Sequence, residues 1–254
     1  MRQSEFIQPV WETPYPAKGV RMKTIFMSVA AAGVAGLLST PALAAGSVAW
    51  TGASATEDSV YVYLGGLVDL DGDLGTSGIA VRAGIWGGQY DYNNGNVVGG
   101  NVDGDQYGGE LLIGYRDVTA NEVFAIYAGV SGEDHDLSPN DPSNPVNGDE
   151  IGVKVLLDMN LNTQGALGLD LMGSYASAFE SYYINLSLPY RFTGFQIGPD
   201  FAALGSESYD QQRVGAKLGF DLGGVNLSLS GGLAIGGRDG DNSPYGGIGL
   251  STTF

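Results

Sequence analysis

Pro244-Tyr-Gly-Gly-Ile-Gly-Leu-Ser-Thr-Thr-Phe254 closes the chain, and its residues alternate with the period of a β-strand. Successive side chains of a strand point to opposite faces, so every second residue shares one face. A segment with this period and an apolar face is expected to pack into a sheet. Bacterial outer-membrane barrels end on such a strand, which closes the barrel, and the segment therefore favours that architecture. Counted back from Phe254, one face carries Thr252, Leu250, Ile248 and Gly246.

The same period of two recurs in the interior of the chain. Between Asp149 and Leu161, and again between Gln211 and Leu222, apolar residues alternate with polar or small ones. A helix would scatter these residues around its circumference, so the pattern predicts strands. The first segment places Ile151, Val153, Val155, Leu157, Met159 and Leu161 on one face and Glu150, Gly152, Lys154, Leu156, Asp158 and Asn160 on the other.

Turn signals divide the chain into antiparallel strands whose connections are alternately short and long. Tight turns such as Gly223-Gly224 fall on the side of the C-terminus, and acidic or proline-rich loops fall on the other side. Outer-membrane barrels show this asymmetry, with short periplasmic turns. We predict an all-β, transmembrane, antiparallel up-and-down β-barrel of twelve strands, with ten as the alternative. The expected long loops are 93–104, 136–148, 204–210 and 236–243, and 69–77 is a medium-length connection expected on the periplasmic side.

Residues 1–44 are expected to form a leader rather than part of the barrel. The segment 22–38 has a short basic start followed by an apolar run, and Pro41-Ala-Leu-Ala44 has the pattern of a signal-peptide cleavage site. We interpret 22–44 as a secretory signal peptide and 1–21 as the product of an early start codon, with the barrel spanning 45–254. A transmembrane anchor is the alternative, but the apolar run is short for a bilayer.

The charge and cysteine content exclude several functions. The chain has 11 basic and 28 acidic residues, of which the leader holds four and two, so the remainder has a net charge of −19. Such an acidic chain has no electrostatic footprint for nucleic acid. Cysteine is absent, which excludes a disulfide framework and a thiolate metal site. We expect no cofactor.

The polar faces of the predicted strands would line the lumen. Their basic and acidic side chains balance, so they could brace the interior, or they could form a polar path for a neutral solute. Trp86, Tyr90, Tyr63 and Tyr183 would offer ring faces to sugars, while other aromatics, including Tyr245 at the outer end, would form the membrane girdles. The lumen candidates are Arg82, Trp86, Tyr90, Glu110, Arg116, Glu150, Lys154, Asp158, Asp170, Arg191, Asp200, Arg213 and Lys217.

Two motifs contain residue types used in catalysis or metal binding, and neither predicts an enzyme or a metal site. His135 is the only histidine and is expected at the surface, four residues after Ser131 on the same strand. A catalytic triad needs neighbours from other strands. The segment 69–75 resembles part of a calcium loop, but it has Leu74 at the sixth position and Ala80 at the twelfth, where an EF-hand needs Gly and Glu. We expect an acidic turn there.

Four stretches occur together in one family. They are Leu67–Gly75 with its Asp-Leu-Asp-Gly-Asp core, Asp134–Gly148 with Leu-Ser-Pro-Asn-Asp-Pro, Ser174–Tyr183, and Gly198–Gly215 with Tyr-Asp-Gln-Gln-Arg-Val. In these stretches the chain resembles the BcsS family of cellulose-biosynthesis accessory proteins. The resemblance implies an outer-membrane location and a link to bacterial cellulose, and it implies no catalytic residues.

Three functional hypotheses follow. The first is a non-enzymatic barrel that assists glucan export or anchors the secretion apparatus. Its expected partners are outer-membrane lipid and either the cellulose secretion machinery or the glucan chain. The second is a general small-solute, porin-like pore. The third is an outer-membrane hydrolase that uses His135.

Overall fold

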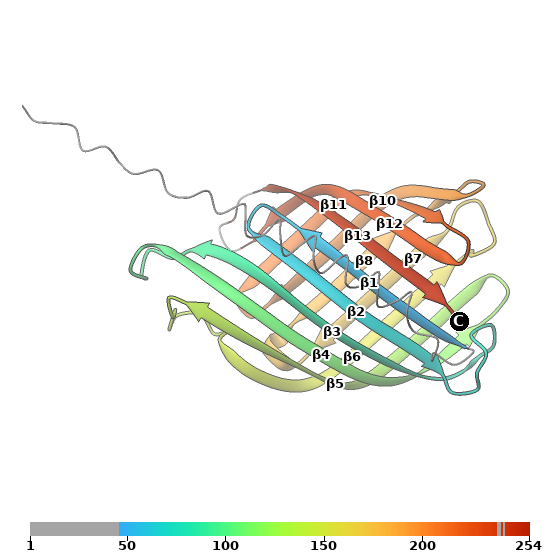
Figure 1. Ribbon diagram of the computed structural model, residues 1–254, viewed down its shortest axis with the longest axis horizontal. Helices are drawn as coiled ribbons and strands as arrows, with labels where there is room; N and C mark the ends of the chain where they lie inside the picture. Colours follow the sequence, from blue (N-terminus) through green and yellow to red (C-terminus); the bar gives the residue numbers. More distant parts are fainter. Residues whose placement is uncertain (1–45, 238–239, 241) are drawn as a thin grey trace, which may run out of the picture.

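A closed antiparallel sheet runs from the first strand to the last and back to the first in the computed structural model (Figure 1). The structure describes residues 46–237, 240 and 242–254, so the expected leader lies outside the described residues. The strands are β1 (Ser47–Ala55), β2 (Ser59–Asp69), β3 (Gly78–Asn93), β4 (Asn101–Val118), β5 (Glu122–Ser138), β6 (Gly148–Leu161), β7 (Leu169–Ala176), β8 (Tyr182–Ser187), β9 (Tyr190–Arg191), β10 (Phe195–Ser206), β11 (Tyr209–Asp221), β12 (Val225–Gly236) and β13 (Ser243–Thr253), with a short 3-10 turn, η1 (Ala178–Glu180), after β7.

The described strands make a twelve-stranded barrel, as predicted. β8 and β9 both pair with β10 and form one strand interrupted at Leu188-Pro189. Proline has no N–H to donate to the sheet, which accounts for the interruption. β13 pairs with β1 and closes the ring. No helix within the described ranges is long and apolar enough to cross a membrane.

The alternation seen in the sequence separates an outer apolar face from an inner polar one. Ile151 and Val153 of β6 are 80% and 67% exposed on the outside of the barrel. So continuous an exposed apolar surface is expected where lipid covers it. Inside the barrel, an apolar cluster fills part of the wall between β2 and β6, and it comprises Leu67, Ala80, Leu112, Ala125, Tyr127 and Leu156.

Two predictions about the outer end of the barrel were wrong. Segment 204–210 is not a long loop, because β10 and β11 stay paired as far as Ser206 and Tyr209 and leave a two-residue turn. The polar residues of this segment form the ends of β10 and β11. A strand end that projects beyond the membrane does not require apolar residues, so its composition resembles that of a loop. Tyr245 does not belong to an outer girdle, because it lines the interior. The expected loop 236–243 includes residues outside the described ranges.

The barrel is taller on one side than on the other. β3 to β6 contain 14 to 18 residues, whereas a tilted strand needs only about 9–11 residues to cross a bilayer. β7 and β8 have eight and six residues. The tall hairpins β3–β4 and β5–β6 therefore project at the end opposite the C-terminus (Figure 1). We call this the loop end, and the end that carries Gly46 and Phe254 the terminal end.

Candidate functional site: the lumen

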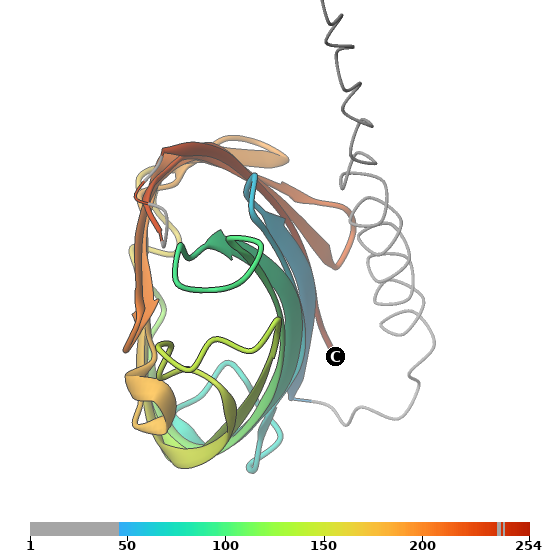
Figure 2. The same cartoon turned by 90° about the vertical axis from the view of Figure 1, so that its left-hand side faces the viewer.

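The interior holds a cavity of about 930 Å³ that follows much of the height of the barrel. It reaches Val123 and Asn160 toward the terminal end and Asp91 and Tyr209 toward the loop end. Viewed from the loop end, the barrel has an oval section (Figure 2). Ten of the thirteen lumen candidates line this cavity, namely Arg82, Trp86, Tyr90, Glu110, Arg116, Lys154, Asp158, Asp200, Arg213 and Lys217.

The other three candidates lie at the two ends of the barrel. At the loop end, Glu150 accepts a hydrogen bond from the backbone N–H of Phe179 at 2.9 Å. At the terminal end, Asp170 and Arg191 are 3.9 Å apart, and Arg191 donates to the carbonyls of Asn162 and Gly165. These side chains fasten rims and turns rather than line the central cavity.

A ladder of buried charges braces one wall of the lumen. Glu110 on β4 accepts from Arg82 Nε on β3 at 2.9 Å and pairs with Lys154 Nζ on β6 at 2.6 Å. The Glu110 side chain is only 5% exposed, and each cation is 15% exposed. A buried carboxylate with two cationic partners avoids the cost of an unpaired internal charge.

The two cations of this ladder also cover the lumen tryptophans. The Arg82 guanidinium lies 4.4 Å from the centre of the Trp50 ring, and Lys154 Nζ lies 4.9 Å from that of Trp86. Trp86 Nε1 in addition donates to Glu133 on β5 at 3.1 Å. Trp86 was expected to offer a free ring face to sugars, but Lys154 already lies over that ring. Glu133 was not among the predicted lumen residues, although its register with Tyr127 on β5 places it on the inner face.

Inward glycines seat the aromatic rings of the neighbouring strand. A Cβ added to Gly108 would lie 2.4 Å from the Trp86 ring, and one added to Gly104 would lie 2.4 Å from the Tyr90 ring. The rings therefore lie flat against the wall, which keeps the lumen wide. The other pairs of this kind are Trp50 over Gly65, Tyr63 over Gly52, Tyr127 over Gly114 and Tyr245 over Gly215.

His135 lies inside the barrel, contrary to the expected surface position. It is 7% exposed, and its ring packs edge-on against Phe179 with 5.0 Å between centroids. Nδ1 is 3.1 Å from the Tyr90 hydroxyl, and Nε2 is 3.6 Å from Glu133. Ser131 Oγ is buried with no hydrogen-bond partner among the described residues. The strand register that turns Tyr127 inward turns His135 inward too.

The loop 139–147 crosses the lumen at the loop end (Figure 2). Its buried Asp141 accepts hydrogen bonds from the Tyr92 hydroxyl and from Asn94 Nδ2, both at 2.7 Å. Asn144 donates to the Tyr92 hydroxyl at 2.9 Å and accepts from Ser208 Oγ at 3.0 Å, so the loop joins β3 to the β10–β11 turn on the far wall. Hydrogen bonds from Ser143, Asn94 and Tyr92 hold the pKa of Asp141 well below its usual range.

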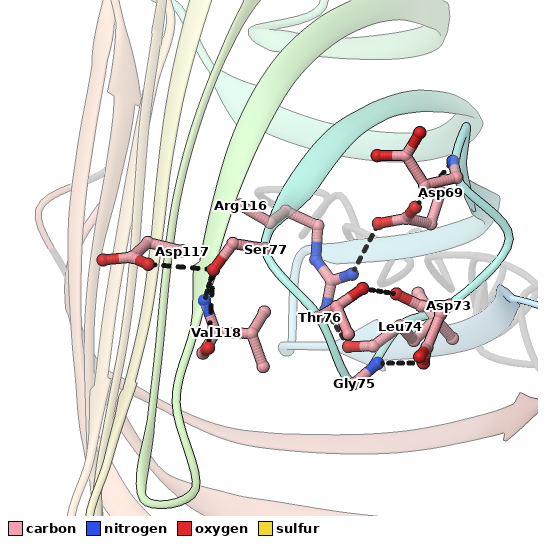
Figure 3. A network of polar contacts seen from close by, with 10 residues as sticks. Asp69, Asp73, Leu74, Gly75, Thr76, Ser77, Arg116, Asp117 and Val118 are labelled. Carbon is pink, nitrogen blue, oxygen red and sulfur yellow. Dashed lines mark hydrogen bonds and ion pairs between the residues drawn. The ribbon is translucent and has the colours of Figure 1, made fainter.

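At the terminal end, the loop 70–77 lies against β4 and is held there by polar contacts (Figure 3). Arg116 on β4 pairs with Asp69 Oδ2 at 3.3 Å and donates to the carbonyl of Leu74 at 3.2 Å. The Leu74 side chain packs against the apolar cluster inside the barrel. Ser77 Oγ donates to Asp117 at 2.9 Å and fixes the far end of the loop to β4.

The calcium-like carboxylates of this loop serve its own folding. Asp69 Oδ1 accepts the N–H of Asp71 at 2.9 Å, and Asp73 Oδ1 accepts that of Gly75 at 2.8 Å. Within the described ranges, no group of three or more His, Cys, Asp or Glu residues is arranged to hold a metal ion. The acidic turn expected from the sequence is therefore a capping arrangement at the barrel mouth.

Comparison with known families identifies the relatives of this chain. The model of a family described as cellulose biosynthesis protein BcsS matches residues 48–254. The chain belongs to the BcsS family. The match covers all twelve strands except the first residue of β1, so the family corresponds to the barrel. A comparison with curated proteins gave no match.

Solved structures similar to the BcsS barrel are bacterial β-barrels. The KdgM porin is 12% identical, with 82% of this chain and 99% of that chain covered at a TM-score of 0.47. The CymD monoaromatic hydrocarbon channel is 7% identical, with 87% and 93% covered at 0.48. The beta domain of the Bordetella autotransporter BrkA is 12% identical, with 83% and 100% covered at 0.47. At such identities the likeness concerns the fold alone.

Proposed function

We propose that this BcsS protein is a non-enzymatic outer-membrane barrel whose lumen accommodates a glucan chain during cellulose production. The observation that carries the proposal is the long cavity of about 930 Å³, lined by paired charges and aromatic rings, in a member of a cellulose-biosynthesis family. Paired charges keep the lumen polar and hydrated but do not bind a free ion, and the aromatic rings offer apolar faces to sugars. The terminal end faces the periplasm, where the cellulose secretion machinery is the expected partner.

The outward face supports the outer-membrane location. On β6, the outward apolar residues Ile151, Val153 and Val155 are exposed. At the terminal end, Tyr190, Phe192 and Phe195 pack with centroids 4.9 and 4.7 Å apart. Aromatic residues at this level suit the interface between acyl chains and headgroups. A closed barrel also satisfies its own backbone hydrogen bonds, which a bilayer requires.

The environment of His135 supports a non-enzymatic role. Both ring nitrogens face polar partners, Tyr90 and Glu133, and the same-strand Ser131 is not bonded to either nitrogen. A hydrolase of the serine type needs a nucleophile within hydrogen-bond reach of its base. If His135 were catalytic, His135→Ala would abolish lipid or ester hydrolysis by the purified protein. We expect no such hydrolysis from either form.

Deletion of the gene, followed by cellulose staining of the colonies, tests the proposal. We expect reduced cellulose at the cell surface, and restoration by the complete gene supplied in trans. Unchanged cellulose output in the deletion strain would refute a role in cellulose production. A general pore is the second candidate, favoured by the length of the cavity. It would carry a steady ion current that cello-oligosaccharides do not block.

A further inference from the structure

Four tyrosines line the lumen from opposite walls. Tyr61 and Tyr63 belong to β2, Tyr183 to β8 and Tyr245 to β13, and all four line the cavity. We call them the tyrosine set. β2 and β8 are six places apart in the twelve-stranded ring, so their side chains approach from opposite walls. The four side chains therefore face one cavity, with Tyr183 on the wall opposite Tyr61 and Tyr63.

The hydroxyls of the tyrosine set have no hydrogen-bond partner in the described part of the chain. Tyr245 is 8% exposed, and its hydroxyl is buried without a partner. By contrast, the hydroxyls of Tyr90 and Tyr92, nearer the loop end, are bonded to His135 and Asp141. A buried tyrosine hydroxyl normally finds a partner. The buried Tyr245 hydroxyl lacks one. Tyr61, Tyr63 and Tyr183 are partly buried and line the cavity, so a polar group that enters the cavity can supply the hydrogen bonds.

Three rings of the set also keep free faces. Trp50, Trp86 and Tyr245 each have a cation over the ring, but Tyr61, Tyr63 and Tyr183 have none among the described residues. Tyr61 and Tyr63 lie beside each other with centroids 6.3 Å apart. The set thus combines apolar faces on two opposite walls with unused hydroxyls. A flat chain of pyranose rings, apolar on both faces and hydroxylated along its edges, matches this arrangement.

The charges around the set disfavour an acidic saccharide. Arg82 and Lys154 are both paired with Glu110, and Arg116 is paired with Asp69. Carboxylates remain beside the set, because Glu133 and Glu110 act electrostatically on Tyr61, and Asp200 acts on Tyr183. Arg213 has no carboxylate partner among the described residues and lies 5.5 Å from the centre of the Tyr245 ring. Asp200 and Glu133 beside the set offset its charge. The set therefore has no net positive charge to attract a uronate chain, and a neutral chain meets no repulsion.

We propose that the tyrosine set is a binding site for a neutral β-1,4-glucan chain, held between the two walls. The inference rests on the proposed function, and it adds a defined site and a selectivity. Stacking comes from Tyr61, Tyr63 and Tyr183, and hydrogen bonds come from all four hydroxyls. An α-1,4 chain coils and presents no continuous flat face, so it fits the two-walled site less well.

Isothermal titration of the detergent-purified protein with cellohexaose tests the site. Maltohexaose and hexagalacturonate serve as coiled and anionic comparisons, and overnight equilibration allows entry past the loops. We expect saturable binding of cellohexaose, at least tenfold weaker binding of maltohexaose and none of hexagalacturonate. Absent binding of cellohexaose, or equal binding of the three sugars, would overturn the proposal.

Hydroxyl deletions localise the binding. Tyr61→Phe, Tyr183→Phe and Tyr245→Phe each remove one hydroxyl and keep the ring, so each should weaken cellohexaose binding about 2- to 10-fold. Tyr175→Phe is the matched control, because Tyr175 lies on the outer face and is 47% exposed. It should bind as the unmodified protein does. Wild-type affinity in all three lumen variants would place the sugar elsewhere and refute the site.

The two proposals fail in different ways. A strain that carries the triple Tyr→Phe variant should produce less cellulose, while the barrel is inserted at the normal level. If cellohexaose does not bind but gene deletion still lowers cellulose, the site is wrong and the role in cellulose production stands. If cellohexaose binds but deletion leaves cellulose unchanged, the site is right and the cellular role is wrong.

Discussion

Replacing Asp69 by Asn should open the terminal mouth of the barrel. The pair of Asp69 with Arg116 is nearly dry, with side chains 0% and 11% exposed. Removing one partner of a buried ion pair costs about 3–5 kcal/mol, since the other charge is left unpaired. At 3.3 Å the contact is longer than the 2.7–2.9 Å or so of a strong charge-assisted hydrogen bond. We therefore take the lower value.

A loss of about 3 kcal/mol changes an equilibrium by roughly a hundredfold. Arg116 also holds the loop through the carbonyl of Leu74, and Leu74 packs inside the barrel. The substitution therefore shifts the loop 70–77 toward an open position without unfolding the strands. Because the pair is buried, salt should screen it little, and the effect should persist in high salt.

Single-channel recording in planar bilayers measures this change. The unmodified protein should show rare, brief openings, and Asp69→Asn should raise the open probability by one to two orders of magnitude. Asp73→Asn is the control, because Asp73 lies in the same loop but is exposed and bonds only within it. It should leave the open probability within a few-fold of the original. Equal open probabilities in the Asp69 variant and the original would refute the role of the loop as a closure.

Three further perturbations test other parts of the lumen. Because the pKa of Asp141 is depressed in the folded loop, the stability of 139–147 should be complete above the unfolded value of about 4 and fall progressively below it. The protection of its amides from hydrogen exchange, relative to the intrinsic exchange rate at each pH, should therefore fall at pH 3 and, in Asp141→Asn, already at pH 7. Glu110→Gln should destabilise the barrel by about 3–5 kcal/mol in urea titrations, because two cations lose their partner; a loss below 1 kcal/mol would contradict the ladder. Gly108→Ala should lower the free energy of unfolding by about 1–3 kcal/mol, because the new methyl group overpacks against the Trp86 ring. Gly173→Ala, with open space around its Cβ, should be nearly neutral. Equal effects would argue against the packing of Trp86 on Gly108.

The alternation of polar and apolar residues predicted most of the residues that line the lumen. Particular residues show why it did not predict the others or their pairing. Lys154 and Glu110 were predicted to face inward, because each lies opposite apolar neighbours on its own strand. Their pairing depends on the register of β4, β5 and β6, which no single strand encodes. Glu133 and His135 lie on the inner face of β5. They were missed because the polar, projecting end of that strand has no apolar face to reveal the parity.

The sequence by itself determined an antiparallel β-barrel of twelve or ten strands and the polarity of its two faces. The period of two and the turn chemistry are local properties, readable within about ten residues. Only the tertiary structure decided that one loop crosses the lumen and another is held by Arg116, that cations occupy the tryptophan faces and that the hydroxyls of the tyrosine set have no partner among the described residues. These features join residues far apart in the chain, such as Asp69 with Arg116 and Asn144 with Ser208. They depend on strand stagger and on where each loop crosses the barrel, and such distances exist only once the ring has closed.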